Sequence, residues 1–210
     1  MKNRKKMQVI ISRLRKEYPV LRTALYFRNP FELLVATILS AQTTDAHVNK
    51  VTEKLFRKYR KLDDYLRVPP DEFREDVRSV NFFNNKAKNI LATSLMIREK
   101  FGGKVPKTMT ELVMLPGVAR KTANIILYNA YGMNEGIAID THVKRLSNRL
   151  GLTSHADPVK IEQDLMAITP RKEWGDLTHL LIAHGRAVCQ ARSPMHAGCV
   201  LADICPSREI

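Results

Sequence analysis

Residues 115–123 read LPGVARKTA and lie between two amphipathic segments. The Pro-Gly pair ends one helix and a second begins at about Ala119, so the stretch predicts a helical hairpin with a tight turn. Arg120 and Lys121 then fall in the first turn of the second helix, where the partial positive charge of the N-terminus disfavours cations. A phosphate bound by the free N–H groups of that turn would make both cations favourable. The hairpin is therefore a candidate phosphate-binding site, with an ordinary solvated hairpin as the alternative.

The composition is strongly basic. The 210 residues carry 35 Lys and Arg against 21 Asp and Glu, a formal net charge of +14 at pH 7. Such an excess attracts polyanions, and nucleic acid is the leading candidate, although a basic protein without that function has the same charge. No stretch is apolar and long enough to span a bilayer, and the first apolar run is too short for a signal peptide. We expect a cytoplasmic protein with no membrane partner.

The pattern of apolar residues predicts an all-α protein. Turn signals separate helix-length segments, and the alternation typical of strands is almost absent. Residues 30–41, PFELLVATILSA, form a nearly all-apolar run that starts with a proline, which predicts a buried central helix. Gly132 is predicted to end the second helix of the hairpin in a left-handed conformation. The other expected helices span 4–17, 45–60, 69–78, 84–101, 108–114, 120–131, 141–150, 158–168 and 172–187.

Two residues suggest chemistry as well as binding. Lys121 is expected near a helix N-terminus and partly buried in a cleft, and both conditions disfavour its ammonium form. A neutral amine is a nucleophile that can attack C1′ of a deoxyribose and give a Schiff base. Asp140 follows the apolar run GIAI and precedes THVKRLSNRL. That is a favourable position for an N-cap, and a cap can also take part in catalysis.

The three cysteines lie near the C-terminus in the pattern Cys189-x6-His196-x2-Cys199-x5-Cys205. An odd, clustered set in an intracellular protein favours metal or redox chemistry over disulfides. The ligand set fits a tetrahedral zinc site. It also fits an iron–sulphur cluster with one imidazole ligand. The third alternative is no metal, with His196 a solvated loop residue.

The stretch LPGVARKTANIILYNAYG, followed by IAIDTHVKRLSNR, resembles the helix-hairpin-helix motif and catalytic Lys/Asp pair of the endonuclease III family. This is a family of base-excision-repair DNA glycosylases with AP lyase activity. PFELLVATILSAQTTD, NNKAKNI and HGRAVC are also similar, so the resemblance covers nearly the whole chain. It implies that Lys121 forms the Schiff base and that Asp140 stabilises positive charge on the sugar or assists deprotonation.

The implied substrate is duplex DNA with damaged, oxidised pyrimidines or abasic sites. The alternatives are a non-catalytic helix-hairpin-helix DNA-binding protein and a mismatch-specific monofunctional glycosylase. The family's monofunctional relatives lack the lysine at position 121, so Lys121 counts against the second alternative, and the Lys121/Asp140 pair counts against the first.

The resemblance also assigns residues to the DNA interface. Gln42 matches a residue that fills the gap left by a flipped nucleotide, and Asp45 would lie near the lesion pocket. Phe82 aligns with the family's apolar wedge, usually Leu, which has a clear purpose because unstacking a base is costly. One ring of the Phe82-Phe83 pair is expected in the core. Asn81 replaces a common Gly and is expected to tolerate a left-handed turn. The full set of predicted DNA contacts is Gln42, Asp45, Phe82, Leu115, Gly117, Ala119, Arg120 and Arg192.

The resemblance favours a [4Fe-4S] cluster over zinc, although the family pattern is C-x6-C-x2-C-x5-C and this chain has His196 at its second position. It also implies a monomer of two lobes with DNA bound in a cleft between them. Residues 22–133 would form a helical barrel, with the hairpin at about 108–131. Residues 1–21 and 134–210 would form the second domain, which carries the cluster loop 189–205.

Overall fold

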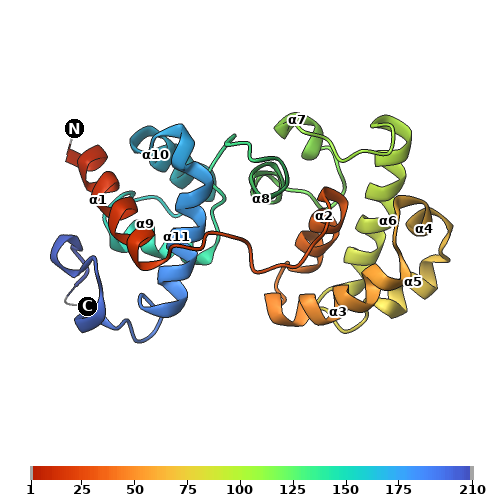
Figure 1. Cartoon of the computed structure of the whole chain (residues 1–210), viewed down its shortest axis with the longest axis horizontal. Helices are drawn as coiled ribbons and strands as arrows, with labels where there is room; N and C mark the ends of the chain where they lie inside the picture. The colour runs from red at the N-terminus through yellow and green to blue at the C-terminus, as the bar shows by residue number, and fades with distance from the viewer. Residues whose placement is uncertain (1, 209–210) are drawn as a thin grey trace. The chain divides into compact units, whose positions relative to one another are not determined.

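The structure, a computed structural model, describes residues 2–208, and all regular structure in that range is helical (Figure 1). The predicted all-α fold is confirmed. The α-helices are α1 (Lys2–Glu17), α2 (Pro30–Leu39), α3 (Asp45–Lys58), α4 (Leu62–Arg67), α5 (Pro70–Asp76), α6 (Phe83–Lys100), α7 (Met109–Leu112), α8 (Arg120–Tyr131), α9 (Thr141–Arg149), α10 (Pro158–Ile168) and α11 (Trp174–Ala187). Short 3-10 helices are η1 (Arg171–Glu173), η2 (His196–Gly198) and η3 (Ala202–Ile204).

The chain forms two compact units. Residues 23–133 make up the middle unit, with helices α2 to α8. Residues 1–22 and 134–210 make up the terminal unit, in which α1 packs against α10 and α11 although more than a hundred residues separate them (Figure 1). Each unit has its own hydrophobic core, so each positions its functional residues independently.

Helix α2 is the centre of the middle unit and contacts α3, α6 and α8. Its side chains from position 32 to position 39 are all buried, as expected for an almost wholly apolar run. Asn29 caps the helix by accepting a hydrogen bond from the N–H of Glu32, and Pro30 occupies the first turn. The predicted buried central helix is confirmed, and it ends at Leu39 because residues 40–44 form a turn.

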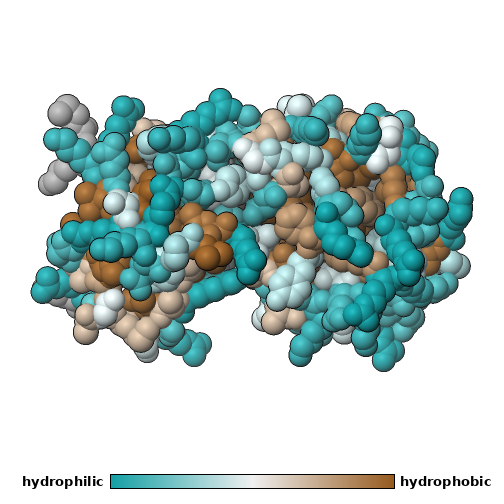
Figure 2. Space-filling model, in the orientation of Figure 1, coloured by the Kyte–Doolittle hydropathy of each residue, from teal (hydrophilic) through white to brown (hydrophobic). Residues whose placement is uncertain are grey.

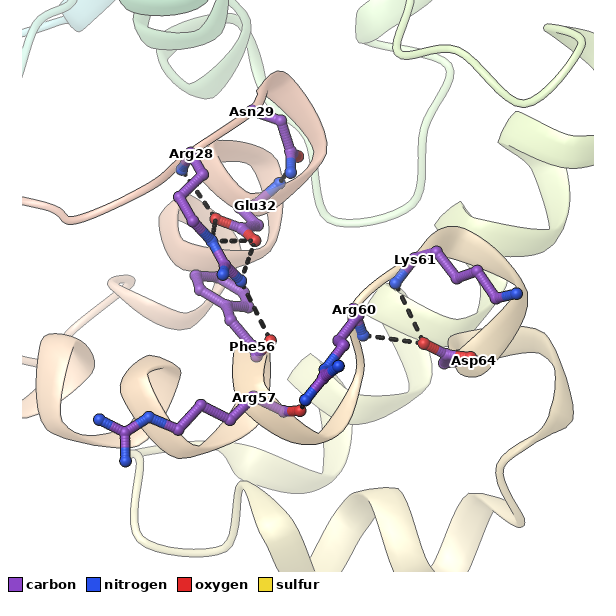
Figure 3. A network of polar contacts seen from close by, with 8 residues as sticks. All are labelled: Arg28, Asn29, Glu32, Phe56, Arg57, Arg60, Lys61 and Asp64. Atoms are coloured by element: carbon purple, nitrogen blue, oxygen red, sulfur yellow. Dashed lines mark hydrogen bonds and ion pairs between the residues drawn. The ribbon is translucent and has the colours of Figure 1, made fainter.

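A buried carboxylate fixes the start of α2 against the end of α3 (Figure 3). Glu32 is only 4% exposed. It accepts hydrogen bonds from the backbone N–H of Arg28 at 2.7 Å and from the Arg28 guanidinium at 2.7 Å. The same guanidinium donates to the carbonyl of Phe56 at 3.1 Å. Because a buried charge must be paired and hydrogen-bonded, this network explains how Glu32 is accommodated.

The beginning of α4 is stabilised by Asp64, whose carboxylate accepts hydrogen bonds from the backbone N–H groups of Arg60 and Lys61 (Figure 3). These bonds hold the pKa of Asp64 below its usual value, and the bond from Lys61 has the largest effect. Sequence analysis did not predict α4, which has only six residues.

The terminal unit joins the two ends of the chain. Met7, Ile10 and Leu14 of α1 are fully buried in its core. Arg13 forms an ion pair with Asp203 and donates to the carbonyl of Val200 at 3.0 Å, which ties α1 to the C-terminal segment. These contacts place α1 beside the segment that contains the cysteines.

The surface is dominated by polar and charged residues. On the face drawn in Figure 2, hydrophilic side chains cover most of each unit, and hydrophobic residues reach the surface in smaller patches. Among the described residues, no helix has the length and apolar character needed to cross a membrane.

Candidate functional site

The hairpin turn between α7 and α8 packs closely on α6. Gly117 has a φ of +80°, in the left-handed region. A Cβ at this position would lie 2.9 Å from Nδ2 and 3.0 Å from Cβ of Asn89. Thr93 of α6 donates a hydrogen bond to the carbonyl of Pro116 at 2.9 Å. The conformation and the space at position 117 therefore both require glycine.

The N-terminus of α8 is open to solvent. Its N-cap residue, Ala119, makes no side-chain cap hydrogen bond, and Ala119, Arg120 and Lys121 are all exposed. The first N–H groups of α8 thus have no side-chain cap, which suits the binding of an anion.

One prediction about the hairpin needs correction. Lys121 is exposed, so the expected partial burial is wrong. The reason is that α8 turns Ala123, Ile126 and Leu127 toward the core, and position 121 lies on the opposite side of the helix. Leu115 is only 2% exposed and belongs to the core of the middle unit. The side chain of Leu115 therefore has a packing role that holds the turn in place, and the DNA contact of this residue stays a prediction.

Asp140 is the N-cap of α9, as its position in the sequence predicts. Its Oδ1 accepts a hydrogen bond from the N–H of Val143 at 2.7 Å. Ile137 and Ile139, which precede it, are buried in the core of the terminal unit and hold this segment in place. Lys121 belongs to the middle unit and Asp140 to the terminal unit.

Gln42 and Phe82 are the two residues other than glycine that have a positive φ, 55° and 57°, in the described part of the chain. Such a conformation is strained for a bulky side chain and is often found at functional sites. Both residues are exposed, and Phe82 is 61% exposed although it is a large apolar residue. Phe83 packs against the core, so one ring of the pair is inside as expected. The left-handed residue is Phe82 and not Asn81, which corrects the predicted turn.

Hydrogen bonds join the two segments that carry these residues. Asn81 donates from Nδ2 to the carbonyl of Gln42 at 2.5 Å and from its backbone N–H to Oγ1 of Thr43 at 3.3 Å. Lys86 of α6 donates to the carbonyl of Leu39 at 2.7 Å and to Oγ1 of Thr43 at 3.0 Å. Sequence analysis missed Lys86. The available signal was its spacing in α6, where a lysine takes a position on the apolar face beside Ala87 and Ile90.

The other two predicted DNA contacts lie in different units. Asp45 is half-buried at the first position of α3, directly after its N-cap Thr44. Arg192 is exposed in the segment between α11 and η2 of the terminal unit.

Cys189, His196, Cys199 and Cys205 line one pocket. The three thiols are half-buried. Nε2 of His196 is buried and has no hydrogen-bond partner among the described residues. A buried polar atom without a partner is unfavourable unless something else binds it, so this donor set fits a metal centre. Burial also raises the pKa of the Cys199 thiol.

Three further contacts surround the sulphur atoms. Arg149 of α9 donates to Sγ of Cys189 at 3.3 Å, and Nε2 of His184 lies 3.4 Å from Sγ of Cys199. The thiol of Cys205 donates to the carbonyl of Arg149 at 3.5 Å. Within residues 2–208, no three His, Cys, Asp or Glu side chains are arranged so that they could share a single metal ion.

Comparison with known proteins identifies the family. The model of the HhH-GPD superfamily of base excision DNA repair proteins matches residues 35–171. Endonuclease III of Synechocystis is 50% identical over 93% of this chain and 90% of its own length. Endonuclease III of Bacillus subtilis is 46% identical over 98% of this chain and 94% of its own length. This chain belongs to the endonuclease III family.

Solved structures of endonuclease III agree with this assignment. A structure of an endonuclease III trapped in a covalent intermediate with DNA superposes with a TM-score of 0.93, at 43% identity, over 98% of this chain and 96% of that one. A thermostable thymine-DNA glycosylase at 24% identity has a TM-score of 0.85 and shows the likeness of fold alone. The predicted family, fold and activity, a base-excision-repair DNA glycosylase with AP lyase activity, are confirmed. Members of the endonuclease III family generally carry a [4Fe-4S] cluster.

Proposed function

We propose that this endonuclease III homologue excises oxidised pyrimidines from duplex DNA and then cleaves the strand, with Lys121 as the nucleophile. The observation that carries the assignment is the N-terminus of α8, where N–H groups without a side-chain cap and the exposed Arg120 adjoin the amine of Lys121. A DNA phosphate bound there would hold the neighbouring sugar within reach of Nζ. The net charge of +14 supports double-stranded DNA as the partner.

Two side chains, Lys121 and Asp140, take part in the proposed reaction. Nζ of Lys121, once neutral, forms a bond to C1′ while the glycosidic bond breaks and its electron pair leaves with the base. Loss of the proton from nitrogen and opening of the sugar ring then give the Schiff base, from which strand cleavage proceeds. Asp140 carries a carboxylate that stabilises positive charge on the sugar or assists deprotonation, while its Oδ1 also caps α9.

We also propose that Cys189, His196, Cys199 and Cys205 hold a [4Fe-4S] cluster, with Nε2 of His196 as one ligand. In a zinc site all four ligands lie about 2–2.3 Å from one ion and are therefore close together. The described residues contain no such group, whereas a four-iron cluster distributes its ligands over four irons, so its ligands do not have to converge on one point. When bound, the cluster supplies one-electron redox chemistry and cross-links the loop.

Borohydride trapping on abasic DNA tests the role of Lys121. Lys121→Arg keeps the positive charge but lacks an amine that can form a Schiff base, so it is the matched control for Lys121→Ala. Both variants should lose covalent trapping completely. Lys121→Arg should bind duplex DNA with nearly unchanged affinity, because the charge beside the phosphate remains. Trapping that persists in either variant would remove Lys121 from this role.

Asp140→Asn tests whether the cap is also a catalytic residue. Asparagine caps helices about as well as aspartate, so the thermal stability should stay near that of the native protein. Single-turnover base excision should fall about 100-fold or more, the usual contribution of a positioned acid or base. Asp140→Ala should show the same loss of activity and about 1 kcal/mol lower stability. Excision that falls only in proportion to stability would leave Asp140 as a cap.

A further inference from the structure

Lys86 is a buried lysine without an acidic partner. It is 5% exposed, and within the described chain its ammonium makes no ion pair. Both of its hydrogen bonds go to neutral oxygens, the carbonyl of Leu39 and the hydroxyl of Thr43. Burial lowers its pKa, and no neighbouring carboxylate opposes that shift. Burial of an unpaired charge is costly in free energy, so the presence of Lys86 at this position needs a physical explanation.

The position of the ammonium at the end of α2 explains why it is tolerated. Leu39 is the last residue of α2, and the last turn of that helix contains no basic residue. The C-terminus of a helix carries a partial negative charge and orphan carbonyl groups, which a cation stabilises. Lys86, which comes from α6, supplies that cation and ties α6 to the end of α2.

The same ammonium also holds the turn that follows α2. Oγ1 of Thr43 accepts hydrogen bonds from Nζ of Lys86 and from the backbone N–H of Asn81. Asn81 in turn donates to the carbonyl of Gln42. The two strained residues, Gln42 and Phe82, therefore lie on either side of one hydrogen-bonded junction made by Thr43, Asn81 and Lys86.

We propose that Lys86 is a positioning residue for nucleotide extrusion, which fixes residues 40–44 against the start of α6 so that Gln42 and Phe82 meet DNA as one preformed pair. The proposal rests on the proposed function, in which these two side chains enter the duplex. A strained, exposed conformation persists only where its surroundings hold it. A wedge held in place before binding avoids the ordering cost that a mobile one would pay when it enters the base stack.

Lys86→Met tests this proposal, because methionine has a similar length but no donor. The control is Lys88→Met, which removes the same charge from an exposed position two residues along α6. Reaction rates on two substrates, measured at saturating enzyme, distinguish a loss of positioning from a general loss of activity. A duplex with an oxidised pyrimidine requires extrusion of the nucleotide, and a single-stranded abasic oligonucleotide does not. Lys86→Met should lower excision from the duplex about tenfold, the order expected for a small misplacement, and change single-stranded cleavage less than about twofold. Lys88→Met should leave both rates near native.

A second variant changes the residue that accepts the hydrogen bond from Lys86. Thr43→Val removes the shared acceptor while it keeps the shape of the side chain, and it should reproduce the selective loss on duplex DNA. Combined with Phe82→Ala, Lys86→Met should cause a smaller further loss than it causes alone, because part of its effect acts through Phe82. Equal losses on the two substrates, or full additivity with Phe82→Ala, would overturn the positioning role. If Phe82→Ala and Gln42→Ala both leave duplex excision unchanged, the assignment of the wedge itself fails, which is a different result.

Discussion

Two regions of the molecule present functional side chains outside regular helices. One is the junction between residues 40–44 and α6, and the other is the segment 189–205. They are held in place in different ways. At the junction, backbone and side-chain hydrogen bonds satisfy the turn, and a buried lysine fixes it to two helices. Within the described part of the C-terminal segment, residues 189–208, Leu201 is the one buried side chain. The ring nitrogen of His196 in that segment is buried without a hydrogen-bond partner.

This difference agrees with the proposal that the C-terminal segment holds a cluster. The junction is complete with protein atoms alone, since its donors and acceptors are matched to one another. Within its described residues, the C-terminal segment has Leu201 as its one buried side chain and a pocket lined by sulphur and imidazole, so the proposed metal centre would contribute to the energy that orders it. We therefore expect the two regions to respond differently to the same treatments.

The largest expected effect concerns iron in the C-terminal segment. His196→Ala should lose most of its iron, because one of the four proposed ligands disappears. His196→Cys should retain about four irons per chain, since thiolate is the usual ligand of this cluster type. Metal analysis and visible absorption of protein purified without oxygen measure both.

Met195→Ala is the control, because Met195 lines the same pocket and has no role as a ligand in the proposal. Limited proteolysis should cleave His196→Ala within 189–205, and hydrogen exchange of residues 40–44 should not change. Stoichiometric zinc in colourless native protein would replace the iron–sulphur assignment. Full activity in metal-free protein would leave His196 as a loop residue.

A smaller effect is expected from glycine substitutions in the middle unit. Gly102 and Gly117 both have positive φ, 59° and 80°. A Cβ at Gly102 meets nothing within 4 Å, whereas one at Gly117 meets the side chain of Asn89. Gly102→Ala should therefore cost about 1 kcal/mol from conformation alone, and Gly117→Ala about 2–3 kcal/mol because the turn must also move.

Urea denaturation measures the free energy of unfolding of both glycine variants. Iron content shows whether either substitution also affects the C-terminal segment. Gly117→Ala should also weaken DNA binding, because the turn orients the N-terminus of α8, while Gly102→Ala should not. Both variants should keep the native iron content. Iron loss in Gly117→Ala would show that the two regions are not independent.

Local signals were sufficient to predict most of the helices and several functional positions. Apolar periodicity and Pro or Gly at the ends placed α2 and α8 nearly to the residue, and Gly132 ends α8 with a φ of 66° as expected. The cap role of Asp140 also follows from local sequence, since the residue directly precedes the periodic segment of α9. These features depend on contacts within a few residues, which a sequence displays directly.

Features that depend on distant contacts were not predicted. The burial of Lys121 was misjudged because exposure at position 121 depends on which face of α8 the rest of the unit covers. The contact of Lys86 with the end of α2 joins residues 47 positions apart in sequence. The left-handed residue is Phe82, whereas Asn81, which replaces a common Gly of the family, bonds to Gln42 and Thr43, which are distant in sequence.

The smallest expected effect is a difference between the units in mild acid. Burial is the main cause that lowers the pKa of His142, His179 and His184, all in the terminal unit, below the ordinary value of 6.5. The middle unit contains a single histidine, His47. Below pH 6.5 these histidines bind protons more readily in the unfolded terminal unit than in the folded one. The free energy of unfolding of this unit should therefore be greatest above pH 6.5 and fall as the pH decreases toward the lowered pKa values.

The pH range from 7 to 5 isolates this effect, because most carboxylates remain ionised there. The single tryptophan, Trp174, lies in the terminal unit, so its fluorescence during urea unfolding reports on that unit alone. The unfolding free energy from fluorescence should fall between pH 7 and 5, and hydrogen exchange in the middle unit should change less. Replacing His142 and His179 by glutamine should reduce the pH slope whatever it does to absolute stability. An unchanged slope in that double variant would assign the acid sensitivity to other groups, and an equal loss in both units would show that they unfold together.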